Sequence, residues 1–446
     1  MVERHPLVTV CIGALVAAAA AHSAWADVIE DWNEVVLDAI RATRTPPPPA
    51  TRALAMTHVA MFDAVNGIER GYEPYAVDRK APPGASPEAA AAMAAYTVLL
   101  DVFPQRSAEL RAALEASLSS GSFSAARHKG VAWGRYCGRK IVALRAHDGA
   151  AEFVPYTPTD EPGRWRPTPP AFAPALLPQW PYVRPFAMRR GDQFRPAPPP
   201  ALTDAAFTSA FTEVKEIGSA SSATRSADQT LIAYFWEDGS GTATPPGHWQ
   251  MIARDLVAGT DADLTARARL FALLSIVQAD AAIASWDAKY AYDHVRPYTA
   301  IVEDAAVDGN PDTVEDAAWT SLIPTPPFPA YTSGHSTFSG GSARLLALFF
   351  GTDEIEFSST SPDPQRWPDI LPGVVRSFTR LSDAAAEAGQ SRIYGGIHWQ
   401  YDNQAGLAAG SALADRVFGR YLRPLPDDPR GPRPNPPWWW RGRRPH

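Results

Sequence analysis

Cysteine is almost absent from this sequence of 446 residues. The two cysteines are Cys11 and Cys137, and Cys11 lies in an apolar N-terminal run that we expect to be removed. The remaining chain would then have no second cysteine with which to form an internal disulfide. We expect Cys137 to be a small buried residue rather than a nucleophile.

Positive charge is also in short supply. The formal net charge is −7 at pH 7, whereas nucleic-acid-binding domains ordinarily present an excess of basic residues. We therefore expect no nucleic-acid partner. Hydrophobic residues make up 46% of the chain and charged residues 20%, which is typical of a globular protein with a sizeable core.

Sustained alternation of polar and apolar residues is missing, so strands should be scarce. Apolar residues recur instead at three- and four-residue spacing, which indicates helices. We expect helices over 27–44, 52–68, 86–102, 124–147, 204–217, 226–236, 249–258, 261–294, 336–350, 373–388 and 399–421. The predicted fold class is all-α, with two packed helical bundles and the functional site in the C-terminal bundle.

Proline divides the chain into these bundles. Prolines recur every few residues between 151 and 202, so this segment cannot form a long helix or a central strand. Its aromatic residues predict an ordered strap over a core: Trp165, Phe172, Trp180, Tyr182 and Phe186. We predict an N-terminal bundle at 27–150, the Pro-rich strap at 151–202, a C-terminal bundle at 203–422 and a Pro-rich basic tail at 423–446.

The first 26 residues have the features of a secretory signal peptide. An apolar run from Leu7 to Ala21 is followed by HSAWA, in which Ala24 and Ala26 form an A-x-A cleavage pattern. The run is shorter than a membrane-spanning helix requires. We therefore expect a periplasmic or secreted protein without a membrane span in the mature chain.

Two stretches place small residues and a histidine where a predicted helix begins. One is AYTSGHSTFSGG at 330–341, which contains Ser333, Gly334 and His335, and the other is GGIHWQYD, which contains His398. A helix N-terminus offers free N–H groups and a partial positive charge. Both stretches therefore predict binding of an oxyanion.

Three basic residues could supply positive charge to such an oxyanion. Lys289 and Arg296 lie seven residues apart in KYAYDHVRP, so we expect them on one face of a helix, about 10 Å apart along its axis. Pro297 should end that helix. Arg392 precedes His398 in SRIYGGIHWQYD, and the three charges would complement an anion such as phosphate or vanadate.

Three motifs occur in a familiar order: K-x6-R-P at 289–297, S-G-H at 333–335 and S-R-x5-H-x3-D at 391–402. Together they resemble the phosphatidic acid phosphatase type 2 superfamily, which includes the vanadium-dependent haloperoxidases. PPFPAYTSGHSTFSGG and FWEDGSGTATPP are similar to segments of the haloperoxidase branch, especially of its chloroperoxidase-like members.

The resemblance implies how a cofactor would be held. His398 would bind the vanadium of vanadate, and phosphate could occupy the same site. The oxygens of the anion would be held by Lys289, Arg296, Arg392, the Ser333 hydroxyl and the Gly334 N–H.

The resemblance also implies roles around that anion. His335 would be the general acid–base, Asp238 would pair with Arg392, and Asp402 would orient His398. Trp286 and Phe328 match aromatic positions near the halide site.

The sequence departs from the family pattern at two places. Thr332 stands where proline usually precedes Ser-Gly-His, which predicts a less rigid cradle. His294 and Val295 precede Arg296, where haloperoxidases often carry tryptophan, and a second imidazole near the cations would alter the halide site.

Three functions are compatible with these residues. The first is a peroxidase that uses vanadate and hydrogen peroxide to oxidise halide to hypohalous acid, with a small-molecule substrate as acceptor. The second is a phosphomonoesterase, in which His398 forms a phosphohistidine and His335 protonates the leaving oxygen. The third is an anion-binding protein without turnover. Asp238, Trp286 and Phe328 favour the peroxidase.

Overall fold

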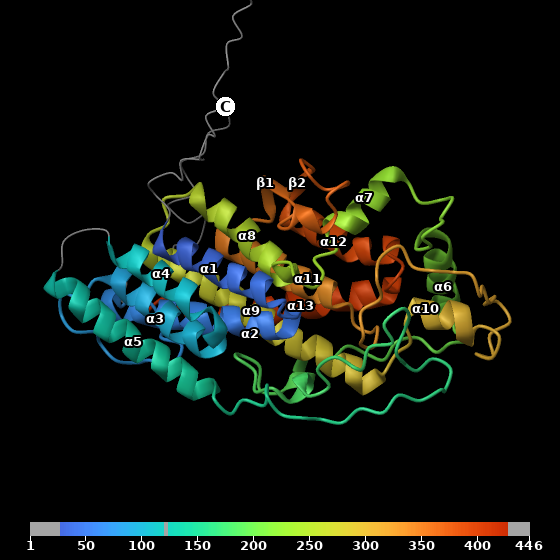
Figure 1. The fold of residues 1–446 in the computed structure, drawn as a ribbon, viewed down its shortest axis with the longest axis horizontal. Helices are drawn as coiled ribbons and strands as arrows, with labels where there is room; N and C mark the ends of the chain where they lie inside the picture. Colours follow the sequence, from blue (N-terminus) through green and yellow to red (C-terminus); the bar gives the residue numbers. More distant parts are fainter. Residues whose placement is uncertain (1–26, 120–123, 427–446) are drawn as a thin grey trace, which may run out of the picture.

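The structure, a computed structural model, describes residues 27–119 and 124–426, so the predicted signal peptide lies outside the described residues. Figure 1 shows an elongated helical body with the N-terminal helices at one end. In chain order the α-helices are α1 (Val28–Thr43), α2 (Pro47–Glu69), α3 (Pro87–Val102), α4 (Ser107–Ser119), α5 (Ala125–Arg145), α6 (Ala205–Ile217), α7 (Ala227–Phe235), α8 (Thr244–Ala258), α9 (Leu264–Tyr292), α10 (Pro297–Thr299), α11 (Gly334–Phe350), α12 (Leu381–Tyr394) and α13 (Gln400–Arg420). In the described part of the chain β1 (Glu354–Thr360) and β2 (Val375–Arg380) form one antiparallel pair, which confirms the all-α prediction.

Most of the expected helices are present, but one was assigned wrongly. The predicted helix at 373–388 is wrong in its first half, because residues 375–380 form β2 and α12 begins only at Leu381. Phe378 of β2 pairs with Phe357 of β1. The apolar spacing in this short segment fits a strand as well as a helix, and only the pairing with β1 decides between them. Helix α4 was not predicted.

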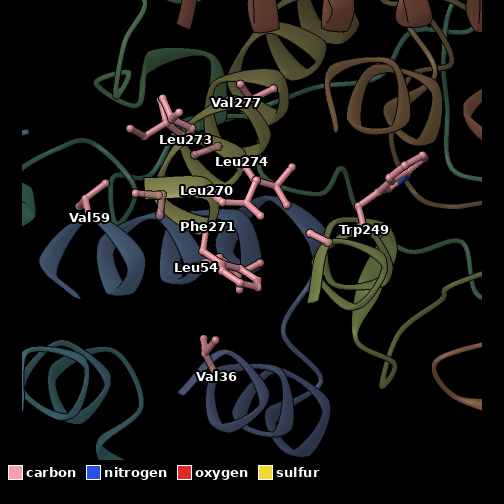
Figure 2. Close-up of a cluster of buried hydrophobic side chains, with 14 of the residues drawn as sticks. Val36, Leu54, Val59, Trp249, Leu270, Phe271, Leu273, Leu274 and Val277 are labelled. Atoms are coloured by element: carbon pink, nitrogen blue, oxygen red, sulfur yellow. The ribbon is translucent and has the colours of Figure 1, made fainter. Parts of the chain in front are cut away.

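Helix α9 is the central element of the fold. Its N-cap Asp263 accepts a hydrogen bond from the Ala266 N–H, and it ends at Tyr292, followed by the C-cap Asp293, whose backbone is left-handed. Figure 2 shows its apolar side chains in a cluster with Leu54 and Val59 of α2 and Trp249 of α8. The main hydrophobic core runs without a break from α1 to α13. The predicted bundle boundaries therefore remain a prediction.

One described helix, α9, is long and apolar enough to cross a membrane, but its apolar 18-residue stretch is wholly buried inside the protein. Its polar residues have partners within the core. Gln278, for example, donates to the Pro246 carbonyl and to Ser342. Helix α9 therefore has the features of a core helix.

Glycines let α11 and α13 pack backbone against backbone. A Cβ atom added at Gly340 would clash with the Leu407 carbonyl, and one at Gly410 would clash with the Thr337 carbonyl. At Gly406 it would lie 2.8 Å from the Ser333 carbonyl oxygen. This close packing brings the N-termini of α11 and α13 together, and each of these termini carries one histidine of the predicted site.

The Pro-rich strap is ordered but covers less of the core than predicted. It contains no α-helix, and its longest regular elements are the short turns Trp180–Tyr182 and Gly191–Phe194. Three of the predicted aromatic residues are buried: Trp165, Trp180 and Phe186. Phe172 and Tyr182, however, are 60% and 73% exposed, so these two aromatics do not pack on a core.

Asp280 of α9 attaches the strap to the core. Its carboxylate accepts hydrogen bonds from the N–H groups of Phe186, Ala187 and Met188 at 2.6–2.8 Å. Burial raises the pKa of Asp280 to about 6, although the three N–H groups favour the charged form. The folded protein therefore binds a proton here that the unfolded chain releases at a lower pH.

We predict that Asp280→Asn removes part of the pH dependence of stability. The contribution of Asp280 is fully present below the unfolded pKa of about 3.8 and is lost as the pH rises through about 6. Urea unfolding measures the free energy of unfolding at pH 4 and at pH 7. Asp280 should account for ~2–3 kcal/mol of the difference between the two pH values in the parent, and the variant should lack that part. The exposed Asp261→Asn should match the parent. Parallel pH curves for parent and Asp280→Asn would contradict this role.

Candidate active site

The predicted site residues come from the ends of five helices. Lys289 lies in the last turn of α9 and Arg392 in the last turn of α12. Arg296 is the N-cap of the short α10, His335 lies in the first turn of α11, and His398 lies just before α13. Residues scattered over more than a hundred positions therefore meet at helix ends.

The expectation that one helix carries Lys289 and Arg296 is wrong. Helix α9 ends at Tyr292, and Asp293 adopts φ 52°, which turns the chain away from the helix. Pro297 begins α10 instead of ending α9, because proline is well suited to the first turn of a helix. The two cations still converge: each lies within 5 Å of the centre of the Phe328 ring.

His398 presents a lone pair to the cations. Its Nδ1 lies 2.8 Å from Asp402 Oδ2, and its Nε2 lies 3.1 Å from Arg296 Nη1. Arginine can only donate, so Nε2 accepts and the neutral ring carries its proton on Nδ1. Burial, followed by the nearby cations, lowers the pKa of His398 well below its ordinary value. A carboxylate on one nitrogen and an unprotonated lone pair on the other is the usual arrangement of a histidine ligand.

Arg296 is buried and only partly hydrogen-bonded. Its Nε donates to the Phe328 carbonyl at 2.8 Å, and its Nη1 donates to the Ile397 carbonyl at 2.7 Å. Its Nη2 is buried without a protein partner. Burial lowers the pKa of Arg296 to about 9. An unpartnered buried donor on a cation is a direct indication of an anion site.

Arg392 and His335 are held by neighbouring carbonyl groups. Arg392 Nη1 donates to the Trp236 carbonyl at 3.0 Å, and its Nε is buried without a partner. His335 Nε2 lies 3.3 Å from the Glu237 carbonyl oxygen, so this nitrogen must carry the proton. The other nitrogen, Nδ1, is then free to accept a proton. Sequence reasoning did not single out Trp236 or Glu237, although both belong to the FWEDGSG segment.

Lys289 is surrounded by three backbone carbonyls. Its Nζ lies 2.9 Å from the Pro329 oxygen, 3.0 Å from that of Ala330 and 2.6 Å from that of Thr332. Burial lowers the pKa of Lys289 well below its ordinary value. Three acceptors nevertheless require three N–H donors, which only the protonated ammonium has. Lys289 therefore also anchors the segment that leads into Ser333.

We predict that Lys289→Met weakens both folding and anion binding. Three buried carbonyls would lose their donor, which should lower the free energy of unfolding by ~3 kcal/mol. The affinity for inorganic phosphate, measured by calorimetry, should fall about tenfold because one charge is lost. The exposed Lys80→Met serves as control. A variant as stable as the parent would show that these hydrogen bonds contribute nothing.

Thr332, which we predicted to make the cradle less rigid, is buried and hydrogen-bonded. The residue is 1% exposed, and its hydroxyl lies 3.3 Å from the hydroxyls of Ser285 and Thr337. Ser333 N donates to the Asp402 carbonyl at 3.2 Å. These contacts replace the conformational restriction that a proline would give, and they tie the start of α11 to the start of α13.

The predicted ion pair between Asp238 and Arg392 is not formed. Asp238 Oδ2 instead lies 3.1 Å from His248 Nδ1, and His248 Nε2 lies 3.1 Å from the Ser359 hydroxyl. Asp238 still favours the charged form of Arg392 through space, whereas burial lowers the pKa of that guanidinium to about 10.

The two halide-site candidates lie beside the cations. The rings of Trp286 and Phe328 have centroids 4.9 Å apart, and Lys289 Nζ lies 4.8 Å from the Phe328 centroid. Their role toward a halide remains a prediction. His294 does not join the cations, because its Nε2 lies 2.7 Å from the Tyr401 hydroxyl.

Lys289, Arg296, Arg392, His335 and His398 form a positively charged nest rather than a site for a bare metal cation. The pKa of His398 is lowered by burial and by Arg296, Lys289 and Arg392, which places all of these groups in one electrostatic neighbourhood. Within the described ranges none of the three cations has a carboxylate at ion-pair distance. The same ranges contain no group of three or more His, Cys, Asp or Glu suited to a metal ion. Unpartnered donors, excess positive charge and one histidine lone pair fit vanadate or phosphate.

Comparison with known proteins points to one family. Residues 269–426 match the family described as the VCPO second helical-bundle domain. The structure of a bacterial vanadium-dependent iodoperoxidase superimposes with a TM-score of 0.77 at 29% identity, over 90% of this chain and 97% of that one. Over most of its length the chain is therefore similar to a vanadium-dependent haloperoxidase, and residues 269–426 match a domain of that family.

Two further known proteins are similar to the chain. Vanadium chloroperoxidase from Curvularia inaequalis is 29% identical over 231 residues, which is 41% of this chain and only 37% of that relative's length. A bacterial vanadium-dependent chloroperoxidase in its apo form shares the fold with a TM-score of 0.68 at 19% identity, over 84% of this chain and 94% of that one. The family match covers every cation of the nest and both of its histidines.

Proposed function

We propose that the chain is a vanadate-dependent peroxidase that oxidises halide with hydrogen peroxide to hypohalous acid. The observation that carries the proposal is the His398 lone pair on Nε2, set 3.1 Å from Arg296 in a buried nest of three cations. Similarity to an iodoperoxidase structure over 90% of the chain favours this reaction over phosphate-ester hydrolysis. The signal-peptide pattern at 1–26 supports action in the periplasm or outside the cell.

The residues suggest how the anion would be held. Arg296 Nη2 and Arg392 Nε supply donors that have no protein partner. His398 Nε2 supplies the lone pair for vanadium, while Asp402 fixes the proton on Nδ1. Bound vanadate would supply a Lewis-acidic centre that activates hydrogen peroxide toward a halide.

His335 is suited to proton transfer. The Glu237 carbonyl holds the proton on Nε2, so Nδ1 can accept a proton from incoming hydrogen peroxide. Burial and then Arg392 lower the pKa of His335 well below its ordinary value, which keeps the ring neutral and ready to accept. His335 is also partly accessible to solvent, which suits a group that exchanges protons. The surrounding charges are fixed before reaction and need no rearrangement.

The test compares two activities of the same purified chain. With vanadate added, we expect peroxide consumption that depends on iodide, bromide or chloride, together with little phosphatase turnover in vanadate-free buffer. Assaying the three halides separately would identify the preferred one. Rapid ester hydrolysis without halide-dependent peroxide consumption would establish the phosphomonoesterase instead.

A further inference from the structure

The loop between β1 and β2 reaches across to the segment that holds His335. Arg366 in this loop makes two hydrogen bonds to the Glu237 carboxylate, Nε at 2.9 Å and Nη2 at 3.1 Å. Asp363 accepts a hydrogen bond from the Ala243 N–H at 2.7 Å and another from Arg41 Nε at 3.0 Å. The loop is thus attached to both ends of the segment 237–243.

Glu237 connects this loop to the site. Its backbone carbonyl oxygen is the partner of His335 Nε2, and the carbonyl before it, from Trp236, accepts from Arg392. Its carboxylate is 6–7% exposed and would be a buried, unpaired charge without Arg366. The backbone at Asp238 adopts φ 43°, an uncommon conformation for a residue other than glycine. External contacts are needed to hold a segment of this kind in one position.

We propose that Arg366 is a positioning residue for His335, acting through Glu237. The bidentate pair fixes the Glu237 backbone, and the fixed carbonyl holds the His335 proton on Nε2. Nδ1 is thereby kept free as the proton acceptor. A planar guanidinium suits this task because its two parallel hydrogen bonds fix orientation as well as distance. The role of His335 as proton acceptor rests on the proposed function, whereas its positioning by Arg366 can be measured without halide oxidation.

The main test measures the chemical reactivity of His335. Diethyl pyrocarbonate modifies unprotonated ring nitrogens, and mass spectrometry of the peptide containing His335 gives the rate in the full chain in phosphate-free buffer. Arg366→Gln should raise this rate about three- to tenfold, because a ring released from its carbonyl partner becomes more mobile and exposes both of its nitrogens to the reagent. Arg366→Lys keeps the charge and one hydrogen bond, and should restore part of the protection.

Arg380→Gln is the matched control. Arg380 lies on the same hairpin but is half exposed and pairs with the exposed Glu354, away from Glu237. Its variant should react like the parent. Glu237→Gln removes the other partner of the Arg366–Glu237 pair. This variant keeps the backbone carbonyl but loses the bidentate charge pair, so it replaces Arg366→Gln if that variant does not fold.

Two further measurements distinguish a positioning role from a general disruption of the site. Phosphate affinity should stay within about threefold of the parent in Arg366→Gln, because Arg296 and His398 do not depend on this loop. The kcat of halide oxidation should fall while the KM for halide is unchanged. Unchanged His335 reactivity in both Arg366→Gln and Glu237→Gln would overturn the proposal, as would a loss of phosphate affinity that parallels the reactivity. If the parent oxidises no halide yet the reactivity changes as expected, the proposed function fails and the positioning role stands.

Discussion

Replacing His398 by alanine is expected to abolish halide oxidation, with a fall in turnover of about a thousandfold or more. The variant loses the Nε2 lone pair and leaves Arg296 Nη1 and Asp402 Oδ2 without their imidazole partner. Affinity for vanadate, measured by equilibrium dialysis, should fall about a hundredfold. Binding and turnover should therefore be lost together, because one nitrogen serves both.

A control and a stability measurement accompany this variant. His147 is exposed, so His147→Ala should bind vanadate and turn over like the parent. Thermal unfolding of His398→Ala in the absence of anion would show whether the fold is retained. Halide oxidation within tenfold of the parent in a folded His398→Ala protein would remove His398 from the proposed mechanism.

Replacing Gly410 by alanine is expected to lower the free energy of unfolding by ~3 kcal/mol, near the upper end of what overpacking usually costs. The added Cβ atom would clash with the Thr337 carbonyl and lie 2.7 Å from the Gly341 nitrogen, both in α11. These are backbone atoms, so no side chain can turn aside to make room. Urea unfolding measures the change, and phosphate affinity should fall as the starts of α11 and α13 separate.

Helix α13 also provides the matched control for this prediction. Gly419 lies in the same helix, and a Cβ atom there would meet nothing within 4 Å. Gly419→Ala should be neutral or stabilise by up to ~1 kcal/mol, because alanine favours a helix more than glycine does. Equal effects at Gly410 and Gly419 would show that close packing of α11 and α13 does not determine stability.

The partners of several residues could not be predicted from local spacing. Arg392 donates to the Trp236 carbonyl, and Asp238 pairs with His248 instead of Arg392. No sequence pattern marks the Trp236 carbonyl, because every residue has a backbone carbonyl. The pairing of Asp238 with His248 depends on how the segment between them folds back. The strand β2 was mistaken for a helix because its partner β1 lies fifteen residues away in the chain.

The sequence alone determined that this protein is helical, since three- and four-residue apolar spacing needs no distant partner to be recognised. It also determined the set of cations and histidines, because Lys289, Arg296, Arg392, His335 and His398 stand in ordered motifs. Only the tertiary structure decided how these groups meet. Glycine contacts between α11 and α13 bring the starts of these two helices together. The end of helix α9 at its C-cap Asp293 changes the direction of the chain and places Arg296 beside His398. Such contacts join residues far apart in the chain, so their geometry depends on packing and not on local sequence.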